Sequence, residues 1–334
     1  MENICVITVI CAYPRTPLSN LLKAIVFCFI FTLLFQASFP DTPVFAEGHT
    51  AIVIQSQTIA AYSEAIKGFE EGCKEKGISI KAIYDMKGDV DEGKRVIKNI
   101  KDNKLRPNLI FAVGVLATAL VKEQFTDIPI IFCMVINYRR FNLAGTNMTG
   151  ISSEVSAEDQ FAILKELLGA NKSVGVIYDP KETGSIVSEA VPIERKSDFN
   201  LIEAEVASEG EVASALNSMI DKIDALWIIP DGTVVTKKSL EIILKMSLKH
   251  RLPVFCTSSA IVKAGALVSI SPDYRQTGLQ TAKMAQTLLS SPTVISLGVK
   301  QPDKLKITLN TQTAGIIRVD ISPLRSRPDV VLYP

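Results

Sequence analysis

The sequence predicts an α/β protein built from two similar lobes, and three observations lead to this fold class. From residue 50 onward, short runs of β-branched residues alternate with amphipathic segments of helical period, which is typical of a parallel sheet covered on both faces. The same order of segments then occurs a second time. The 334 residues suffice for two domains of roughly 100–200 residues each. Each half is therefore expected to form a Rossmann-like lobe.

The first 46 residues are expected to be an export signal and no part of the fold. Ala24 to Phe35 is an uninterrupted apolar run of 12 residues, with Arg15 and Lys23 before it. This run is shorter than the about 20 apolar residues that span a bilayer. Val44-Phe45-Ala46 follows, so we predict cleavage after Ala46, with a retained anchor or a core helix as the alternative. There is no lipobox, because Cys28 lies inside the apolar run.

The first half of the mature chain is predicted to run βαβαβαβ. Its strands are expected at Ala51–Gln55, Ile78–Tyr84, Asn108–Val113 and Ile128–Val135. The segments between them carry apolar residues three and four positions apart, as a helix buried on one face requires. These helices are expected at Tyr62–Lys76, Val90–Asp102 and Val115–Gln124.

The second half repeats this order. NLIFAVGVLAT followed by DIPIIFC in the first half corresponds to ALWIIPDGTVV followed by RLPVFC in the second. Strands are expected at Ser173–Tyr178, Asn200–Val206, Ala225–Ile229 and Pro253–Cys256. Helices are expected through Ser185–Ala190, at Glu211–Lys222 and at Lys237–Lys249. Pro192 should end or kink the first of these helices near Val191.

The remaining chain is too short for a third domain and is expected to cross back between the lobes. A helix at Asp273–Leu289 should join the first lobe, and a strand at Leu305–Leu309 with a Pro- and Arg-rich tail should join the second. The predicted lobes are residues 47–147 with 272–298, and residues 148–271 with 299–334. Three hinge segments would connect them, near residues 145–150, 269–271 and 299–304.

Composition argues for a binding protein. The 36 Lys and Arg residues against 35 Asp and Glu give a formal net charge of +1, which does not suggest a nucleic-acid partner. His49 and His250 are the only histidines, so His-based metal sites and Ser-His-Asp systems have little to draw on. We therefore predict no catalytic residue, no metal ligand and no cofactor. Three cysteines follow the signal, an odd number that does not suggest a disulfide framework: Cys73, Cys133 and Cys256. Cys133 and Cys256 end apolar runs and are expected to be buried hydrophobes.

The candidate binding residues follow the predicted strands. Ligands of open parallel sheets bind beyond the carboxyl ends of the strands, where helix N-termini present unpaired N–H groups. Two such sheets facing each other predict a cleft between the lobes. Most of the groups there are neutral and polar, which suits capture of a small polar molecule. They are Gln55, Gly114, Val115, Ala117, Asn137, Asp179, Asp231, Gly232, Thr233 and Ser258.

The chain also resembles a known family. IPIIFCMVIN, AGTNMTGIS, ELLGANKSVGVIYDPKETGS, DALWIIPDGTVV and LPVFCTSSAIVKAGALVSISPDY, in this order, are similar to the ABC-transporter substrate-binding family associated with tryptophan and tyrosine uptake. The resemblance covers nearly all of residues 50–315. It implies the type I periplasmic binding-protein fold, and solute capture for an inner-membrane permease whose ATPase is another chain. It adds Ser185 and Asp273 to the candidates, whereas Asn137-Tyr138 replaces the Asp-Pro step of the family.

An amino acid or similar zwitterion is the favoured ligand, because few aromatic residues stand at strand ends to sandwich a sugar. Ser and Thr hydroxyls and helix N–H groups would hold its carboxylate, and Asp273 or Asp231 would neutralise its ammonium group. Asp231 and Asp273 could instead serve only as helix caps. A sugar or nucleoside ligand remains an alternative, as does a periplasmic sensor that docks on a membrane receptor. In each case we expect a monomer.

Overall fold

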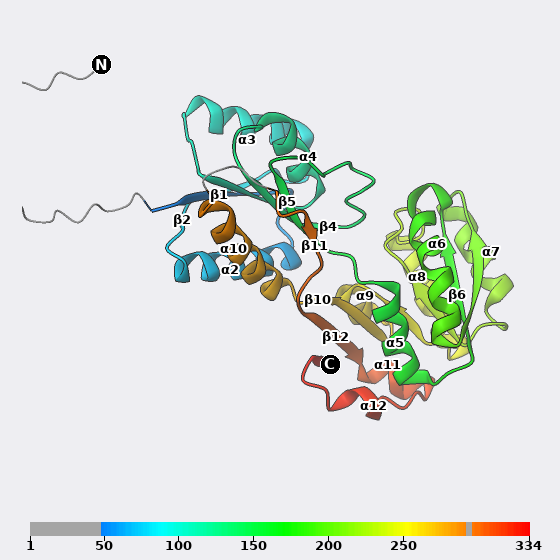
Figure 1. Cartoon of the computed structure of the whole chain (residues 1–334). Helices are drawn as coiled ribbons and strands as arrows, with labels where there is room; N and C mark the ends of the chain where they lie inside the picture. The colour runs from blue at the N-terminus through cyan, green and yellow to red at the C-terminus, as the bar shows by residue number, and fades with distance from the viewer. Residues whose placement is uncertain (1–47, 292–295) are drawn as a thin grey trace, which may run out of the picture. The chain divides into compact units, whose positions relative to one another are not determined.

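Two mostly parallel sheets, each with helices on both faces, form the fold (Figure 1). The structure is a computed structural model that describes residues 48–291 and 296–334. The predicted export signal lies outside these residues. Within them, no helix has the length and apolar character needed to cross a membrane.

The first sheet has the strand order β11-β5-β4-β3-β1-β2, and all of its strand pairs are parallel. Its strands are β1 (Thr50–Gln55), β2 (Ser79–Asp85), β3 (Leu109–Val113), β4 (Ile130–Val135), β5 (Met148–Ser152) and β11 (Val299–Lys300). Two helices pack on each face: α2 (Ala60–Glu75) and α10 (Tyr274–Leu289) on one, α3 (Val90–Asp102) and α4 (Val115–Gln124) on the other. We call this sheet and its helices lobe 1.

The second sheet has the order β13-β12-β10-β9-β8-β6-β7, and only the pair of β10 with β12 is antiparallel. Its strands are β6 (Lys172–Tyr178), β7 (Phe199–Glu205), β8 (Ala225–Ile228), β9 (Val254–Cys256), β10 (Val268–Pro272), β12 (Leu305–Asn310) and β13 (Val330–Tyr333). Its helices are α5 (Ala157–Leu168), α6 (Pro180–Ser197), α7 (Val212–Met219), α8 (Lys237–His250), α9 (Ser259–Ala264), α11 (Thr311–Ile317) and α12 (Ser322–Arg325). We call this sheet and its helices lobe 2.

Two short strands move the predicted lobe boundaries. β5 pairs with β4, and β11 pairs with β5, so residues 148–152 and 299–300 belong to the first sheet. The sequence had placed both segments in the second lobe. The first connection between the sheets therefore follows Ser152. The other two lie between β10 and α10, and between β11 and β12.

Pro192 does not end α6, which continues to Ser197. A proline at this position leaves the carbonyl of residue 188 without its helical donor. Ser188 and Pro192 are both exposed, so water can hydrogen-bond to that carbonyl. Of the two outcomes predicted for Pro192, an end or a kink of the helix near Val191, the end is therefore wrong.

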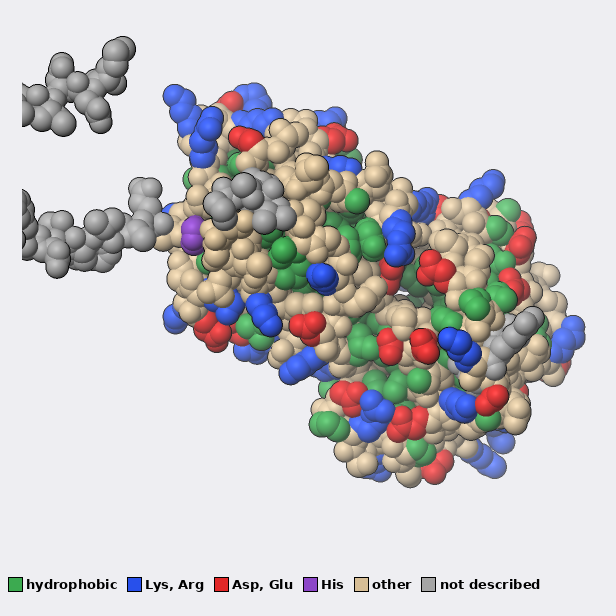
Figure 2. All heavy atoms as spheres, viewed as in Figure 1, with side chains coloured by type: hydrophobic (Ala, Val, Ile, Leu, Met, Phe, Trp, Pro, Cys, Tyr) green, Lys and Arg blue, Asp and Glu red, His purple; other side chains and the backbone are tan. Residues whose placement is uncertain are grey.

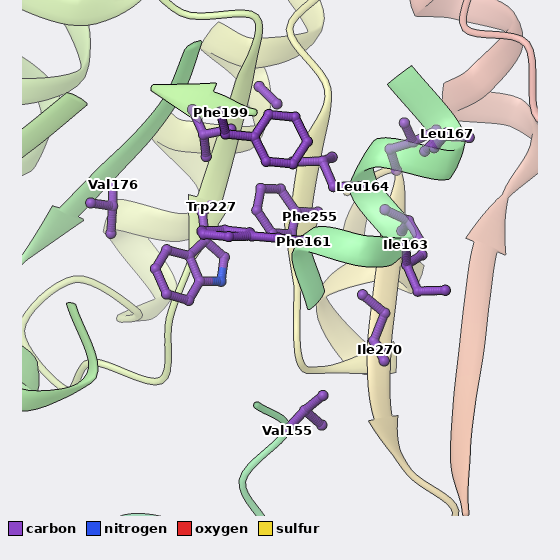
Figure 3. Close-up of a cluster of buried hydrophobic side chains, with 14 of the residues drawn as sticks. Val155, Phe161, Ile163, Leu164, Leu167, Val176, Phe199, Trp227, Phe255 and Ile270 are labelled. Atoms are coloured by element: carbon purple, nitrogen blue, oxygen red, sulfur yellow. The ribbon is translucent and has the colours of Figure 1, made fainter. Parts of the chain in front are cut away.

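The core of lobe 2 contains a cluster of aromatic side chains (Figure 3). Phe161 of α5 packs edge-on against Trp227 of β8, with ring centroids 5.2 Å apart, and Trp227 stacks on Phe255 of β9. The indole Nε1 of Trp227 donates a hydrogen bond of 2.8 Å to Oε1 of Gln160. The only tryptophan of the chain thus fills the core with its polar atom satisfied.

Helices α2 and α10 lie side by side on one face of the first sheet and approach unusually closely (Figure 1). A Cβ atom at Gly278 would lie only 2.0 Å from the carbonyl oxygen of Ala65 and 2.6 Å from the backbone nitrogen of Phe69. A Cβ at Gly68 would meet the carbonyl of Arg275 in the same way. The two backbones touch because these positions carry no side chain.

The cysteines behave as buried hydrophobes. Cys73, Cys133 and Cys256 are free and buried. Burial raises the pKa of the Cys73 and Cys256 thiols to about 12, and it raises the pKa of Cys133 as well. All three stay protonated at neutral pH, and a thiol is a poor nucleophile.

Candidate ligand-binding site

A cavity of about 930 Å³ is lined by residues from both lobes. Lobe 1 contributes the start of α2, the end of β4 and the start of α10. Lobe 2 contributes the end of β8, the start of α9, and parts of β10, β12 and β13. The cavity is at the upper end of the roughly 300–1,000 Å³ typical of small-molecule sites.

The start of α2 presents free backbone donors to this cavity. Ile59 precedes the helix in an extended conformation, and no side chain caps the first turn. Ala60, Ala61 and Tyr62 line the cavity. The first N–H groups of a helix have no acceptor inside it, and the helix dipole adds positive potential there. This end of the cavity can therefore hold an anionic group such as a carboxylate.

Asp273 brings a carboxylate to the start of α10 in the same cavity. Its Oδ1 accepts a hydrogen bond of 3.1 Å from the backbone N–H of Gln276 and so caps the helix. Its Oδ2 accepts no hydrogen bond from another residue of the described part of the chain. One oxygen thus fixes the side chain, and the other is free to accept a hydrogen bond from a cation in the cavity.

The remaining wall is hydroxylated and apolar. Ser153, Ser258, Ser271 and Thr308 are among the hydroxyl-bearing residues. Burial raises the pKa of both Tyr62 and Tyr274, which also line the cavity, so their phenols stay neutral hydrogen-bonding groups. Four of the nine exposed large hydrophobic residues in the described ranges line it too: Ile59, Ile136, Val331 and Leu332.

This concentration of exposed apolar side chains favours a ligand with an apolar part, because large exposed apolar surface usually marks a binding site. On the molecular face shown in Figure 2, positively charged Lys and Arg side chains are interspersed with negatively charged Asp and Glu side chains.

Two of the twelve residues predicted from the sequence, Ser258 and Asp273, line the cavity. The other ten lie elsewhere in the lobes. In lobe 1, Gly114 adopts a positive φ of 90°, and a Cβ there would meet the hydroxyls of Ser56 and Tyr62 at 2.6 Å. Ala117 donates its N–H to Oγ of Ser56. Val115 follows Gly114 and begins α4. Asn137 lies in the turn after β4 and has a positive φ of 51°.

Gln55 lies at the end of β1, beside these turns. Its Nε2 donates to Thr58, whereas its Oε1 is buried without a hydrogen-bond partner. A binding role for Gln55 stays a prediction.

In lobe 2, Asp179 and Asp231 form a hydrogen-bonded network of their own. Asp231 is 1% exposed, and its carboxylate accepts from the N–H groups of Asp179, Thr233 and Val234 and from the hydroxyl of Thr183. Thr233 donates in turn to Asp179. Both oxygens of Asp231 are thereby occupied, so Asp273 is the better candidate for neutralising an ammonium group. Gly232 follows Asp231 in the same turn, and Ser185 lies on α6, six residues after Asp179.

An ion pair connects the two lobes beside this network. Arg140 follows β4 in lobe 1, and its guanidinium holds both carboxylate oxygens of Glu182 in the first turn of α6, with Nη2 2.8 Å from Oε1. The hydrogen bonds raise the pKa of Arg140 and lower that of Glu182. A bidentate pair of this kind fixes direction as well as distance.

We expect this pair to stabilise the present arrangement of the lobes. The R140E variant should increase the radius of gyration of ligand-free protein in small-angle X-ray scattering, and the R140E/E182R double variant should restore it. High salt should expand the wild type, because the pair is partly exposed and screened. The pair of Arg275 with Glu71 is also bidentate but lies within lobe 1, so E71Q is the control and should leave the radius of gyration unchanged. An unchanged radius in R140E would contradict this expectation.

Sequence reasoning missed the start of α2, the hydroxyl of Ser153 and the whole of β13. The uncapped α2 could have been noticed, because Ile59 stands where Ser, Thr, Asp or Asn usually caps a helix. β13 could have been noticed as a strand from its run Val-Val-Leu-Tyr, but its place beside β12 depends on pairing between segments distant in sequence.

Comparison with known proteins places the chain in a family. A family model described as ABC transporter substrate binding protein matches residues 50–323. The chain belongs to this family. Members are substrate-binding components of ABC transporters, with a small-molecule ligand and a transporter as partner. The resemblance seen in the sequence is confirmed.

Individual relatives agree with this assignment. A tyrosine-binding protein from Clostridioides difficile (strain R20291) is 25% identical over 264 residues, which cover 75% of each chain. The ligand-free, open structure of a substrate binding protein with adhesive properties from Clostridium difficile has a TM-score of 0.74 and 23% identity, covering 85% of this chain and 99% of that one. A Streptococcus pneumonia domain in complex with L-Trp has a TM-score of 0.65 and 22% identity, covering 85% and 100%.

These likenesses confirm the predicted type I periplasmic binding-protein fold. In the described part of the chain, no group of three or more His, Cys, Asp or Glu side chains is placed to hold a metal ion.

Proposed function

We propose that this substrate-binding protein captures an amino acid with a large apolar side chain in the cavity between its lobes. The observation that carries the proposal is the combination, within one cavity, of the free N–H groups of α2, the free oxygen of Asp273 and an exposed apolar wall. A zwitterion with an apolar side chain presents the complementary groups. The names of two relatives, which refer to tyrosine and L-Trp, support an aromatic amino acid.

In the proposed complex, the ligand carboxylate lies at the start of α2. Its negative charge meets the positive end of the helix, and neighbouring hydroxyls such as that of Ser258 complete its hydrogen bonds. The ammonium group donates to Oδ2 of Asp273. The side chain contacts the apolar wall. The ligand then stabilises whichever lobe arrangement it contacts best, so binding favours closure at the three connections.

The proposed cellular role follows from the family. The protein would be exported, lose residues 1–46, act as a monomer and hand its unchanged ligand to the permease of an ABC importer. Intact mass measurement of exported protein should then give a chain that begins at Glu47. The alternatives of a sugar or nucleoside ligand, or of a sensor, are not favoured by the relatives.

A thermal-shift screen tests the ligand class. Tyrosine, tryptophan and phenylalanine should raise the melting temperature more than alanine does, while glucose and uridine should not raise it. A ligand at a hundredfold excess over its dissociation constant adds about 2.7 kcal/mol to the free energy of unfolding. Stabilisation by a sugar or nucleoside with silence from all amino acids would refute the proposal.

A further inference from the structure

The last strand of lobe 2 forms part of the cavity although it follows the region that matches the family model. That region ends at residue 323, whereas β13 comprises Val330–Tyr333. β13 pairs in parallel with β12. The preceding turn is held by Arg327, which bonds both oxygens of Asp329 and reaches Glu166 of α5. The strand is thus anchored in the lobe.

β13 is an edge strand with exposed apolar side chains, and these line the ligand cavity. Val331 and Leu332 are 42% and 37% exposed, and Tyr333 lines the cavity beside them. Proteins usually protect an edge strand with charges or proline, because exposed apolar edges pair with other chains. Because the exposed apolar side chains of β13 line a cavity, they can contact a ligand there.

The register of the strands places β13 at the end of the cavity away from Asp273. On β12, Lys306 is opposite Ser271 of β10, whereas Thr308 is opposite Val331 and Asn310 is opposite Tyr333. At about 3.3 Å per residue, Val331 lies two strands over from Ser271 and about 7 Å further along, and Tyr333 about 13 Å further along. A ligand whose ammonium group is bound at Asp273 must therefore extend its side chain to reach β13.

We infer that β13 determines which side chains the site accepts, with Val331 contacting the far end of the ligand side chain. This inference rests on the proposed function. It assigns specificity for large aromatic amino acids to exposed apolar side chains of a strand outside the matched region. A short ligand such as alanine would bind Asp273 and α2 without touching β13.

Calorimetric titration of L-Trp, L-Tyr, L-Leu and L-Ala tests the inference in two directions. V331F, which fills the far end, should weaken binding of L-Trp at least tenfold relative to L-Ala. V331A removes two methyl groups at the contact and should weaken L-Trp about threefold to tenfold, again with L-Ala unaffected. The matched control is I316A, because Ile316 is an exposed apolar residue of α11, 51% exposed, that does not line the cavity. It should bind all four ligands as the wild type does.

The outcomes separate the two proposals. If the wild type binds none of the four amino acids, the proposed function fails and the role of β13 fails with it. If the wild type binds L-Trp or L-Tyr but V331F and V331A keep the wild-type ratio between L-Trp and L-Ala, only the role of β13 is overturned. Circular dichroism melting shows whether V331F folds, and V331A decides the result if it does not.

Discussion

The G278A variant should lose about 3 kcal/mol of its free energy of unfolding, at the upper end for overpacked sites. The added methyl group would lie 2.0 Å from the carbonyl oxygen of Ala65 and 2.6 Å from the backbone nitrogen of Phe69, and both distances are too short for non-bonded atoms. Backbone atoms cannot rotate away as the end of a side chain can, so α10 must move off α2. That movement separates the apolar side chains that both helices bury on the first sheet, including Phe69 and Ala282.

Urea unfolding measures this loss, and G315A is its matched control. Gly315 is also inside a helix, but nothing lies within 4 Å of a Cβ built there. Alanine at that position should gain about 0.5–1 kcal/mol, because it restricts the unfolded chain more than glycine does. Equal stability of G278A and the wild type would show that the close packing of α2 and α10 is not required.

The D273N variant should bind an amino-acid ligand about 10- to 100-fold more weakly. This factor corresponds to the loss of a hydrogen bond to a charged group, which contributes about 1.5–3 kcal/mol. Asparagine caps a helix as well as aspartate does, so the bond to Gln276 and the start of α10 are kept. What is lost is the negative charge that balances the ligand ammonium group. Calorimetric titration with tyrosine or tryptophan checks the result.

Asp89 gives the control for this variant. It caps α3 through a hydrogen bond of 2.7 Å to the N–H of Glu92 and is not among the residues that line the cavity. D89N should leave affinity unchanged. If D273N binds as tightly as the wild type, Asp273 serves only as a helix cap, the alternative that its sequence position left open.

Local signals predicted many elements closely. The bounds of α3 and α4 agree with the sequence prediction, because Asp89 caps α3 and Gly114 starts α4 with a positive φ. The duplicated order of strand and helix is confirmed by β3-α4-β4 and β8-α8-β9, which occupy the central strands of the two sheets. Such features depend on neighbours within a few residues, and the sequence alone contains those neighbours.

The candidate site was less predictable. The strand-end rule and the family resemblance named twelve residues, of which Ser258 and Asp273 line the cavity. Asp231 has the residue type and the strand-end position expected of a ligand contact, yet its oxygens are occupied within lobe 2. Whether a polar group is free for a ligand depends on its partners in space, and those of Asp231 are up to 52 residues away in the chain.

The sequence by itself determined the α/β alternation, the duplication and the helix caps, because periodicity and capping act between residues close in the chain. The tertiary structure alone decided that β5 and β11 join the first sheet, that α2 and α10 touch through Gly68 and Gly278, and that β13 completes the cavity. Each of these depends on backbone groups distant in sequence meeting at hydrogen-bonding or van der Waals distance. Such meetings are set by the packing of whole sheets and helices, so no local pattern of residues specifies them.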